Sequence, residues 1–225
     1  MEKNTEKKAL CVSNGSINQP LRLRDLLVRR YGFDSSYFVA AADGGARNCL
    51  SMNIFPDIII GDLDSINAGV LSILNNRADS PAKFISHKKN KDECDTQLAV
   101  DYLINSGFEK ILITGVFGDR ADHSFANILL LANPAYLGRD LKIITLNSEI
   151  FVTDKSMEIT GHPGKRISLF SLSPFTYFKK TEGLKFSLKN EKLLFSPVRG
   201  ISNEFTSQTA KIEITGGMIL VILQL

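Results

Sequence analysis

The stretch DIIIGDLDS, residues 57–65, is the part of the chain that says most about its fold. Its first half is a short aliphatic run ending in glycine, which is typical of a strand buried in a parallel sheet. Its second half brings two carboxylates, Asp62 and Asp64, directly after that strand. Because open α/β sheets bind ligands at the carboxyl ends of their strands, the stretch predicts both a strand and one part of a ligand site.

This strand is one of six similar apolar runs in the first part of the chain. The predicted strands are residues 9–13, 37–42, 57–61, 83–86, 110–115 and 142–146. Between them, apolar residues recur at intervals of three and four, which predicts helices over residues 21–31, 45–52, 67–76, 96–105 and 123–132. Strands that alternate with helices predict a Rossmann-like parallel sheet with helices packed against it.

The pattern changes near residue 150. From Phe151 onward no segment has convincing helical spacing, and short alternating stretches such as 166–172 and 211–214 are separated by Gly, Pro, Ser and Asn. This favours an antiparallel β domain. We therefore predict an α/β domain over residues 1–153 and a β-sandwich domain over residues 154–225, with the boundary between Val152 and Met157.

The composition agrees with folded domains and excludes several classes of protein. Of 225 residues, 44% are apolar, which is enough for real hydrophobic cores. The longest apolar run, residues 218–223, is far shorter than the ~20 residues of a membrane-spanning helix, and it suits either a core strand or an interface. A net charge of +3, spread along the chain, gives little support for nucleic-acid binding.

The cysteines and the first residues bear on the cellular compartment. Cys11, Cys49 and Cys94 are odd in number and share no metal-ligand spacing, so we expect neither a disulfide framework nor a structural zinc site. Residues 1–10 are polar and lack the apolar stretch of a secretory signal. We expect a cytoplasmic protein with a small or specific partner.

Carboxylates follow four of the predicted strands. The four segments are ADGG at 42–45, GDLDS at 61–65, KDECD at 91–95 and GVFGDRADH at 115–123. Asp62 and Asp64, two apart on an extended backbone, point to the same side and repel each other unless a cation lies between them. Oxygen ligands of this kind suit Mg²⁺, which completes its shell with water and phosphates. An ordinary acidic turn would explain one such pair, but four acidic strand ends favour a site.

Several residues in these segments have two interpretations. Asp95 precedes a predicted helix and suits either an N-cap or a metal ligand, and Asp122 has the same alternatives. The loop 115–120 offers glycines, an arginine and a helix start, which suits phosphate, although it is not a Walker A sequence. His123 is more typical of a surface or capping residue than of a base, and Cys94 of a space-filling residue than of a nucleophile.

Taken together, five ordered motifs resemble those of the thiamin pyrophosphokinase family. They are ADGG at 42–45, PDxIxGDxDS at 56–65, KDxxD at 91–95, GxxGxRxDH at 115–123 with Asn127, and GISN at 200–203. The resemblance implies an α/β domain followed by a β domain, and transfer of a pyrophosphoryl group from ATP to the thiamin hydroxyl, giving thiamin diphosphate and AMP. It also implies a homodimer with thiamin sites at the subunit interface.

The resemblance assigns roles to individual residues. Metal ligands are Asp62, Asp64 and Asp95, and the thiamin pocket includes Ser202 and Asn203. The nucleotide positions are Asp43, Gly44, Gly115, Gly118, Arg120, Asp122, His123 and Asn127. Charge neutralisation by Mg²⁺ and Arg120 agrees with the needs of phosphoryl transfer, and Asp62, as a ligand of the metal, is counted with Arg120 among the catalytic residues. Asp92 is our choice for the group that accepts the hydroxyl proton.

Three positions depart from the family pattern. Cys94 stands where threonine is common, so a hydroxyl is replaced by a poorer sulfhydryl donor. Asp119 stands where a second glycine is common, and we expect it to point to solvent or to Arg120. The chain has no tryptophan to place against thiamin, which leaves Phe205 and Tyr177 as candidates.

Two other classes of protein share part of these features. The segment GDLDS after an aliphatic strand also resembles the nucleophile motif of haloacid-dehalogenase-like phosphatases, in which Asp62 would be phosphorylated. That motif usually follows an early first strand, whereas here it follows the third. A nucleotide-binding regulator without turnover is the other alternative, and Cys94 is the feature that supports it.

Overall fold

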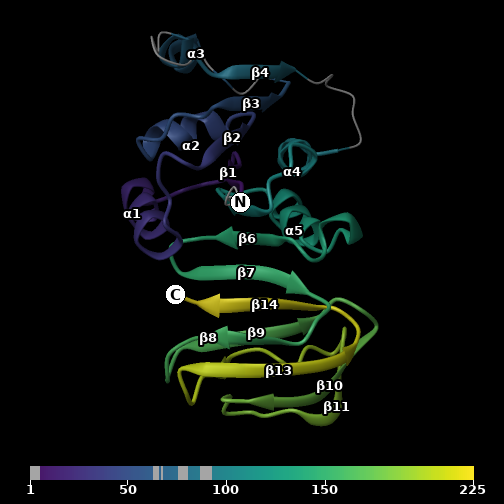
Figure 1. The fold of residues 1–225 in the computed structure, drawn as a ribbon. Coiled ribbons are helices and arrows are strands. Elements are labelled where there is room, and N and C mark those ends of the chain that lie inside the picture. Colours follow the sequence, from purple (N-terminus) through teal and green to yellow (C-terminus); the bar gives the residue numbers. More distant parts are fainter. Residues whose placement is uncertain (1–5, 63–65, 67, 76–80, 87–92) are drawn as a thin grey trace, which may run out of the picture. The chain divides into compact units, whose positions relative to one another are not determined.

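A computed structural model describes residues 6–62, 66, 68–75, 81–86 and 93–225 (Figure 1). The chain divides into two compact units, which are described separately. The first comprises residues 1–130 and 139–146, and the second comprises residues 131–138 and 147–225. Among the described residues, no helix is long and apolar enough to cross a membrane.

The first unit contains all six predicted strands and all five predicted helices. The strands are β1 (Lys8–Val12), β2 (Phe38–Ala42), β3 (Ile58–Gly61), β4 (Lys83–Ser86), β5 (Lys110–Thr114) and β6 (Asp140–Ile144). The helices are α1 (Pro20–Tyr31), α2 (Gly45–Ser51), α3 (Ala68–Asn75), α4 (Asp95–Asn105) and α5 (Ala121–Leu130). Their bounds differ from the predicted ones by at most two residues.

The strands of this unit form a parallel sheet, as predicted. Their order is β6-β5-β1-β2-β3-β4, and every pair in it runs parallel. The chain builds outward from β1 to β4 and then returns to the other side of β1 to add β5 and β6. The order therefore reverses between β1 and β5, and at such a point the loops at the carboxyl ends diverge and leave a crevice.

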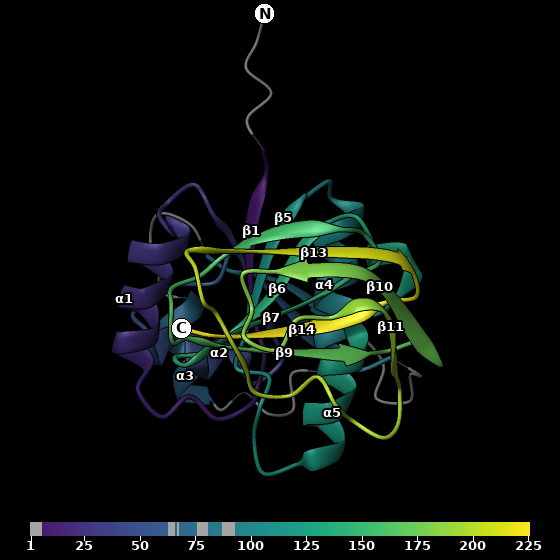
Figure 2. The ribbon, with the colours of Figure 1, turned by 90° about the horizontal axis from the view of Figure 1, so that it is seen from below.

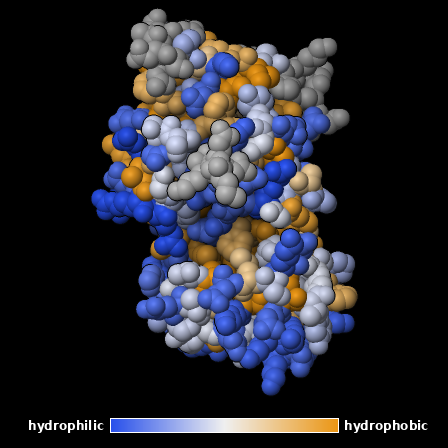
Figure 3. Space-filling model, viewed as in Figure 1, coloured by the Kyte–Doolittle hydropathy of each residue, from blue (hydrophilic) through white to orange (hydrophobic). Residues whose placement is uncertain are grey.

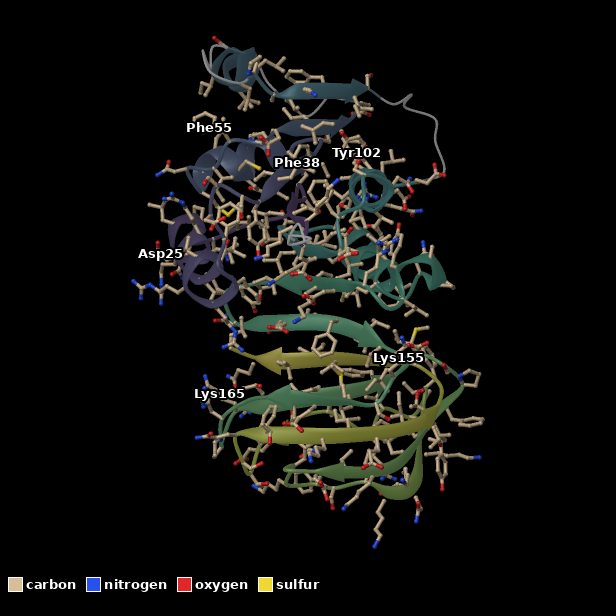
Figure 4. The ribbon with its side chains drawn as sticks, viewed as in Figure 1. Asp25, Phe38, Phe55, Tyr102, Lys155 and Lys165 are labelled. Carbon is tan, nitrogen blue, oxygen red and sulfur yellow. The ribbon has the colours of Figure 1, made fainter. Side chains whose placement is uncertain are left out.

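Helices cover both faces of this sheet. Leu27 of α1 and Cys49 of α2 are buried against one face, together with alternate residues of the strands. On the other face, Val100 and Leu103 of α4 are fully buried. Figure 4 shows Phe38 of β2 beside Tyr102 of α4, with ring centroids 6.5 Å apart. The central strands are thus buried on both sides, which is why they are continuous apolar runs.

Helix α1 shows how local sequence sets the length of an element. Pro20 occupies its first turn, and the helix stops before Gly32, which adopts a left-handed conformation with φ 66°. The Gly32 and Phe33 N–H groups donate to the Val28 and Leu27 carbonyls, both at 3.1 Å. The outer surface of this helix carries arginines and is hydrophilic in Figure 3.

The second unit is an antiparallel sandwich, also as predicted. After a short 3-10 turn, η1 (Pro134–Tyr136), its strands are β7 (Ser148–Thr153), β8 (Met157–Thr160), β9 (Arg166–Ser171), β10 (Phe175–Glu182), β11 (Lys189–Leu194), β12 (Asn203–Glu204), β13 (Thr209–Gly216) and β14 (Ile219–Gln224). One layer has the order β12-β9-β14-β7 and the other β11-β10-β13-β8. Figure 2 separates β13 and β10 of one layer from β14 and β9 of the other.

Strand β14 decides between the two interpretations of the apolar run 218–223. It lies between β7 and β9 and pairs with both. Ile219, Val221 and Leu223 are buried in the sandwich core, so the run is a core strand. The chain end is held in place: the Leu225 N–H donates to the Asn147 carbonyl at 2.9 Å, and Lys165 Nζ (Figure 4) donates to the Leu225 carbonyl at 3.0 Å.

The division between the units falls one strand earlier than the predicted boundary between Val152 and Met157. Strand β7 pairs with β14 along its whole length, from Ser148 to Thr153, and so belongs to the sandwich. Its aliphatic middle follows closely on β6 along the chain. Sequence alone could not assign such a strand, because the assignment depends on a partner about 70 residues further along the chain.

Candidate active site

A pocket of about 870 Å³ lies in the first unit, at the carboxyl ends of the parallel strands. Its size is within the range of small-molecule sites, ~300–1,000 Å³. The predicted site residues that line it are Asp43, Asp62, Asp95, Gly118, Arg120, Asp122, His123 and Asn127. These residues come from four separate motifs, so the fold brings together what the sequence places far apart.

The loop after β1 also lines the pocket, and the sequence analysis missed it. Residues 13–16 (SNGS) lie where the strand order reverses, between β1 and β5. The backbone N–H groups of Gly15 and Ser16 donate to the carbonyls of Gly115 and Phe117, both at 2.6 Å. A Cβ at Gly15 would lie 2.3 Å from the Phe117 oxygen, so only glycine fits there. The available signal was a glycine three residues after the end of β1.

Asp43 is the most unusual side chain of the pocket. It directly follows β2, is only 5% exposed, and has a φ of 47°, which is rare for a residue other than glycine. Its Oδ1 atom is buried and has no hydrogen-bond partner among the described residues. A buried carboxylate oxygen without a partner destabilises the folded chain, so this position favours a ligand role.

Asp43 and Asp95 converge on the end of β3. A Cβ placed on Gly61 would lie 2.8 Å from the Asp43 Cβ and 3.2 Å from Asp95 Oδ1. Because Gly61 has no side chain, Asp43 and Asp95 can both pack against the end of β3. Asp62 is the next residue along the chain and is half-buried.

Helix α4 begins one residue earlier than predicted, which corrects the role of Asp95. Cys94 occupies the N-cap position and makes no side-chain capping bond, while Asp95 is the first helical residue. The interpretation of Asp95 as the N-cap is therefore wrong, because the helical turn already includes it. The Ser13 and Thr96 hydroxyl groups are hydrogen-bonded at 2.9 Å and connect this turn to the loop after β1.

The loop after β5 is shaped by packing more than by exposed amides. Gly115 has a φ of 69°, and a Cβ there would lie 2.5 Å from the Ser13 carbonyl oxygen. The Gly118 N–H donates to Ser124 Oγ at 3.2 Å. Asn127 is buried, and its Nδ2 donates to the Val116 carbonyl at 3.0 Å. The loop thus has a defined shape before any ligand binds.

Arg120 is paired with Asp122 at the start of α5. Its Nε and Nη2 atoms donate to the two oxygens of Asp122 at 3.1 and 2.5 Å, and both side chains are exposed. The hydrogen bonds from Arg120 lower the pKa of Asp122 to about 2, and the same contact raises the pKa of Arg120. Asp119 does not form this ion pair, and it lines the pocket together with the exposed His123.

The pocket is strongly acidic. Among the described residues, its lining holds one arginine and six carboxylates: Asp43, Asp62, Glu93, Asp95, Asp119 and Asp122. Asp64 and Asp92, predicted as metal ligand and proton acceptor, lie outside the described residues. Within the described residues, no three His, Cys, Asp or Glu side chains come together closely enough to form a metal site.

Two family models match the chain in succession. The model of the thiamin pyrophosphokinase catalytic domain covers residues 30–145, and that of the thiamin pyrophosphokinase vitamin B1 binding domain covers residues 152–219. The chain belongs to the thiamin pyrophosphokinase family. It is therefore an enzyme, a transferase of the thiamin diphosphokinase type, as the resemblance of its motifs implies.

Individual members of the family agree with this assignment. A thiamine pyrophosphokinase of Bacillus subtilis is 27% identical over 182 residues, which cover 80% of this chain and 84% of the relative. One from Oryza sativa is 24% identical over 84% of this chain and 80% of the relative. The crystal structure of the B. subtilis protein has the same fold, with a TM-score of 0.82, 24% identity, and coverage of 97% and 99% of the two chains.

The family assignment also bears on the phosphatase alternative. Asp62 follows the third strand of the sheet, whereas the phosphatase motif belongs after an early first strand. Both family models are of thiamin pyrophosphokinase and together span most of the chain. The motif GDLDS is thus part of a thiamin pyrophosphokinase catalytic domain.

The residues that resemble the family's thiamin pocket lie in the second unit. Ser202 is exposed with a φ of 56°, and its N–H donates to Ser168 Oγ at 3.0 Å. Asn203 is buried, and its side-chain oxygen accepts from the Phe186 and Glu204 N–H groups, both at 2.9 Å. Its Nδ2 donates to the Phe186 carbonyl at 2.8 Å. Asn203 thus holds the backbone at Phe186.

The two aromatic residues considered for thiamin have different environments. Phe205 is 2% exposed and lies in the sandwich core, where its ring fills the space beside Gly161. It is therefore not a stacking surface. Tyr177 on β10 is half-buried, whereas Phe186, which the sequence analysis did not consider, is 63% exposed.

Proposed function

We propose that the chain transfers a pyrophosphoryl group from ATP to the thiamin hydroxyl, with Mg²⁺, and forms thiamin diphosphate and AMP. The observation that carries this proposal is the acidic pocket at the reversal point of the sheet, whose lining includes Asp43 with a buried Oδ1 that has no partner among the described residues. Six carboxylates would repel a polyphosphate unless cations bind between them. The family assignment supplies the thiamin substrate.

The donor set of the pocket suits Mg²⁺. Asp43, Asp62 and Asp95 offer carboxylate oxygens only, which is the chemistry that Mg²⁺ prefers, and Asp43 Oδ1 has no protein partner among the described residues. We propose Asp62, Asp64 and Asp95 as the ligands, with Asp43 beside them. Magnesium, when bound, neutralises charge on the phosphates of ATP.

The protein's own groups position the reactants. The thiamin hydroxyl oxygen attacks the β-phosphorus of ATP, the bond from that phosphorus to the α-phosphate oxygen breaks, and AMP leaves. Arg120 leaves Asp122 to donate to the phosphates and stabilises the charge that develops there. Asp92 accepts the hydroxyl proton in this proposal. Gly44, Gly115, Gly118, His123 and Asn127 shape the nucleotide site.

For thiamin, we propose that Phe186 provides the aromatic surface. Its ring is 63% exposed, and two hydrogen bonds of the Asn203 side chain hold the N–H and the carbonyl of Phe186 itself. Thiamin carries a positively charged thiazolium ring, which an aromatic face attracts. In this arrangement Asn203 acts through Phe186, and the exposed Ser202 contacts thiamin.

The proposal keeps the domain roles, the assembly and the location that the sequence suggested. The first unit binds ATP and Mg²⁺, and the second binds thiamin and forms a homodimer in the cytoplasm. Exposed apolar side chains in the second unit, Phe195, Val198 and Ile201, support an interface there, since each is more than half exposed.

The test is an assay of AMP release with ATP, Mg²⁺ and thiamin. We expect AMP only when thiamin is present, loss of activity with EDTA, and a decrease of about 100-fold in Asp95→Asn. Asp25→Asn, an exposed carboxylate on α1 (Figure 4), is the matched control and keeps full activity. ATP binding without AMP formation would favour the nucleotide-binding regulator instead.

A further inference from the structure

Asn14, in the loop after β1, is a polar side chain of the pocket to which no motif assigns a role. It is exposed and lines the pocket at the point where the strand order reverses. Its Oδ1 accepts a hydrogen bond from Arg47 Nη2 at 3.1 Å. Arg47 lies on α2, 33 residues further along the chain, so this contact is a product of the fold.

The contact with Arg47 determines which way the Asn14 amide faces. A guanidinium group can only donate hydrogen bonds, so the oxygen of the amide must face Arg47 and the nitrogen must face away from it. Within the described residues, the Asn14 Nδ2 makes no hydrogen bond. Two N–H donors of Asn14 are therefore available to a ligand in the pocket.

Gly44 makes room for this amide. A Cβ on Gly44 would lie 2.4 Å from Asn14 Oδ1 and 2.6 Å from Asn14 Nδ2, so the amide packs directly over the glycine. The preceding residue is Asp43, which lines the same pocket together with Asn14, Asp62 and Asp95. The donors of Asn14 are thus next to the place where cations and phosphates are expected.

The backbone on either side of Asn14 is held firmly. The Asn48 side chain donates to the carbonyls of Ser13 and Gly15 at 2.8 and 2.7 Å. The Ser13 N–H donates to the Thr114 carbonyl at 2.8 Å, and the Gly15 N–H to Gly115 at 2.6 Å. A donor on so rigid a loop loses little conformational entropy when it binds a ligand.

We propose that Asn14 binds a phosphate oxygen of ATP through Nδ2, and that Arg47 is a positioning residue that orients its amide. This inference rests on the proposed function and extends it to the loop after β1. A phosphate oxygen is the acceptor that best suits two N–H donors beside a cation site, because the hydrogen bonds and the cation both stabilise its negative charge.

The test compares KM for ATP in variants of Asn14. Asn14→Ala removes the donors and raises KM for ATP several-fold, whereas Asn14→Asp also adds a negative charge and raises it by about tenfold or more. KM for thiamin stays within twofold of wild type in both variants. Calorimetric titration with ATP and Mg²⁺ shows the same order of dissociation constants, and thermal unfolding confirms that both variants are folded.

Variants of the neighbouring residues test the positioning role. Arg47→Met raises KM for ATP without lowering kcat, and Arg47→Lys, which also can only donate, restores part of the affinity. Gly44→Ala displaces the Asn14 amide and raises KM for ATP. In an Asn14→Gly variant the added methyl group meets no side chain at position 14, so Gly44→Ala changes KM for ATP little further.

Two results would overturn the inference. One is an active wild-type enzyme whose Asn14→Asp variant keeps KM for ATP and the calorimetric constant within twofold. The other is an equal effect of Asn14→Ala and Asn14→Asp, which would indicate a neutral acceptor in place of phosphate. Failure of the proposed function looks different, because the wild-type chain itself would then form no AMP with thiamin.

Discussion

The two units of the chain use their polar side chains in opposite ways. In the second unit, Asn203 makes three hydrogen bonds to backbone groups, and the buried Ser171 and Thr176 hydroxyls bond to each other at 2.8 Å. In the first unit, Asp43 Oδ1 is buried without a partner among the described residues. Satisfied polar groups stabilise a fold, whereas unsatisfied ones cost stability and are retained for a ligand.

The same contrast holds for the backbone. Each unit has a non-glycine residue with positive φ inside a family motif, Asp43 at 47° and Ser202 at 56°. The Ser202 N–H donates to Ser168 Oγ, and the side chain of its neighbour Asn203 accepts a hydrogen bond from the Phe186 N–H. Asp43 instead combines an uncommon backbone conformation with a buried Oδ1 that has no partner in the described part of the chain. We conclude that the pocket of the first unit lowers the stability of the fold, whereas the polar residues of the second unit's family motif stabilise it.

The largest expected effect is that of Asp43→Asn, which tests the cost of the unpaired carboxylate. Activity falls by about 100-fold, because a negative charge beside the proposed magnesium ligands is lost. The free energy of unfolding stays the same or rises by up to about 1 kcal/mol, since a buried charge is removed. AMP release and thermal unfolding measure the two effects. A clear loss of stability would contradict the contrast between the units.

Asn203→Ala tests the second unit in the same way and has the reverse outcome. It leaves the N–H and carbonyl of Phe186 without partners and destabilises the chain by about 2 kcal/mol. KM for thiamin rises while KM for ATP is unchanged. Gln208→Ala, an exposed amide of the same unit, is the control and alters neither quantity. Denaturant unfolding and steady-state kinetics measure these changes, and unchanged stability in Asn203→Ala would refute the structural role.

The smallest effects concern two exposed ion pairs of similar spacing. Arg120→Gln raises KM for ATP by about tenfold, because Arg120 is proposed to bind phosphate. Lys180→Gln breaks the Lys180–Glu182 pair of the second unit and leaves kinetics unchanged. Neither change alters stability much, since exposed pairs contribute little.

The pH dependence of this effect follows from the pKa of Asp122. That pKa is lowered from 3.8 to about 2, so Asp122 stays charged above 3.8 and its pair with Arg120 is lost only as the pH falls toward 2. The ratio of KM values between Arg120→Gln and wild type is therefore the same at about pH 5.5 and about pH 8.5. A change of this ratio beyond the one that titration of the terminal ATP phosphate causes would contradict the low pKa of Asp122.

Much of the fold could be predicted because its signals are local. The aliphatic runs before Asp43 and Asp62 mark buried strands, and Pro20 and Gly32 mark the two ends of α1. The acidic strand ends also predicted where the pocket lies, since the carboxyl ends of parallel strands share one edge of the sheet. The start of α4 was placed one residue late, which changed the position of Asp95 from cap to first turn.

The side-chain roles could be predicted less well. Asn203 belongs to a family motif, yet two of its three side-chain hydrogen bonds go to Phe186, 17 residues earlier in the chain. Phe205 seemed available for stacking, but its ring is in the core. Ser13 and Thr96 are 83 residues apart and share a hydrogen bond. None of these contacts has a local sequence pattern, because each depends on which strands become neighbours.

The sequence by itself determined the alternation of strands and helices, the change to a β domain and the acidic motifs of the family. These features follow from periodicity and turn chemistry over a few residues. Only the tertiary structure decided that Asp43 Oδ1 is buried without a described partner, that Arg47 orients Asn14, and that β7 belongs to the sandwich. Burial and hydrogen-bond partners depend on segments that are distant in the chain, and these become neighbours only when the whole chain folds.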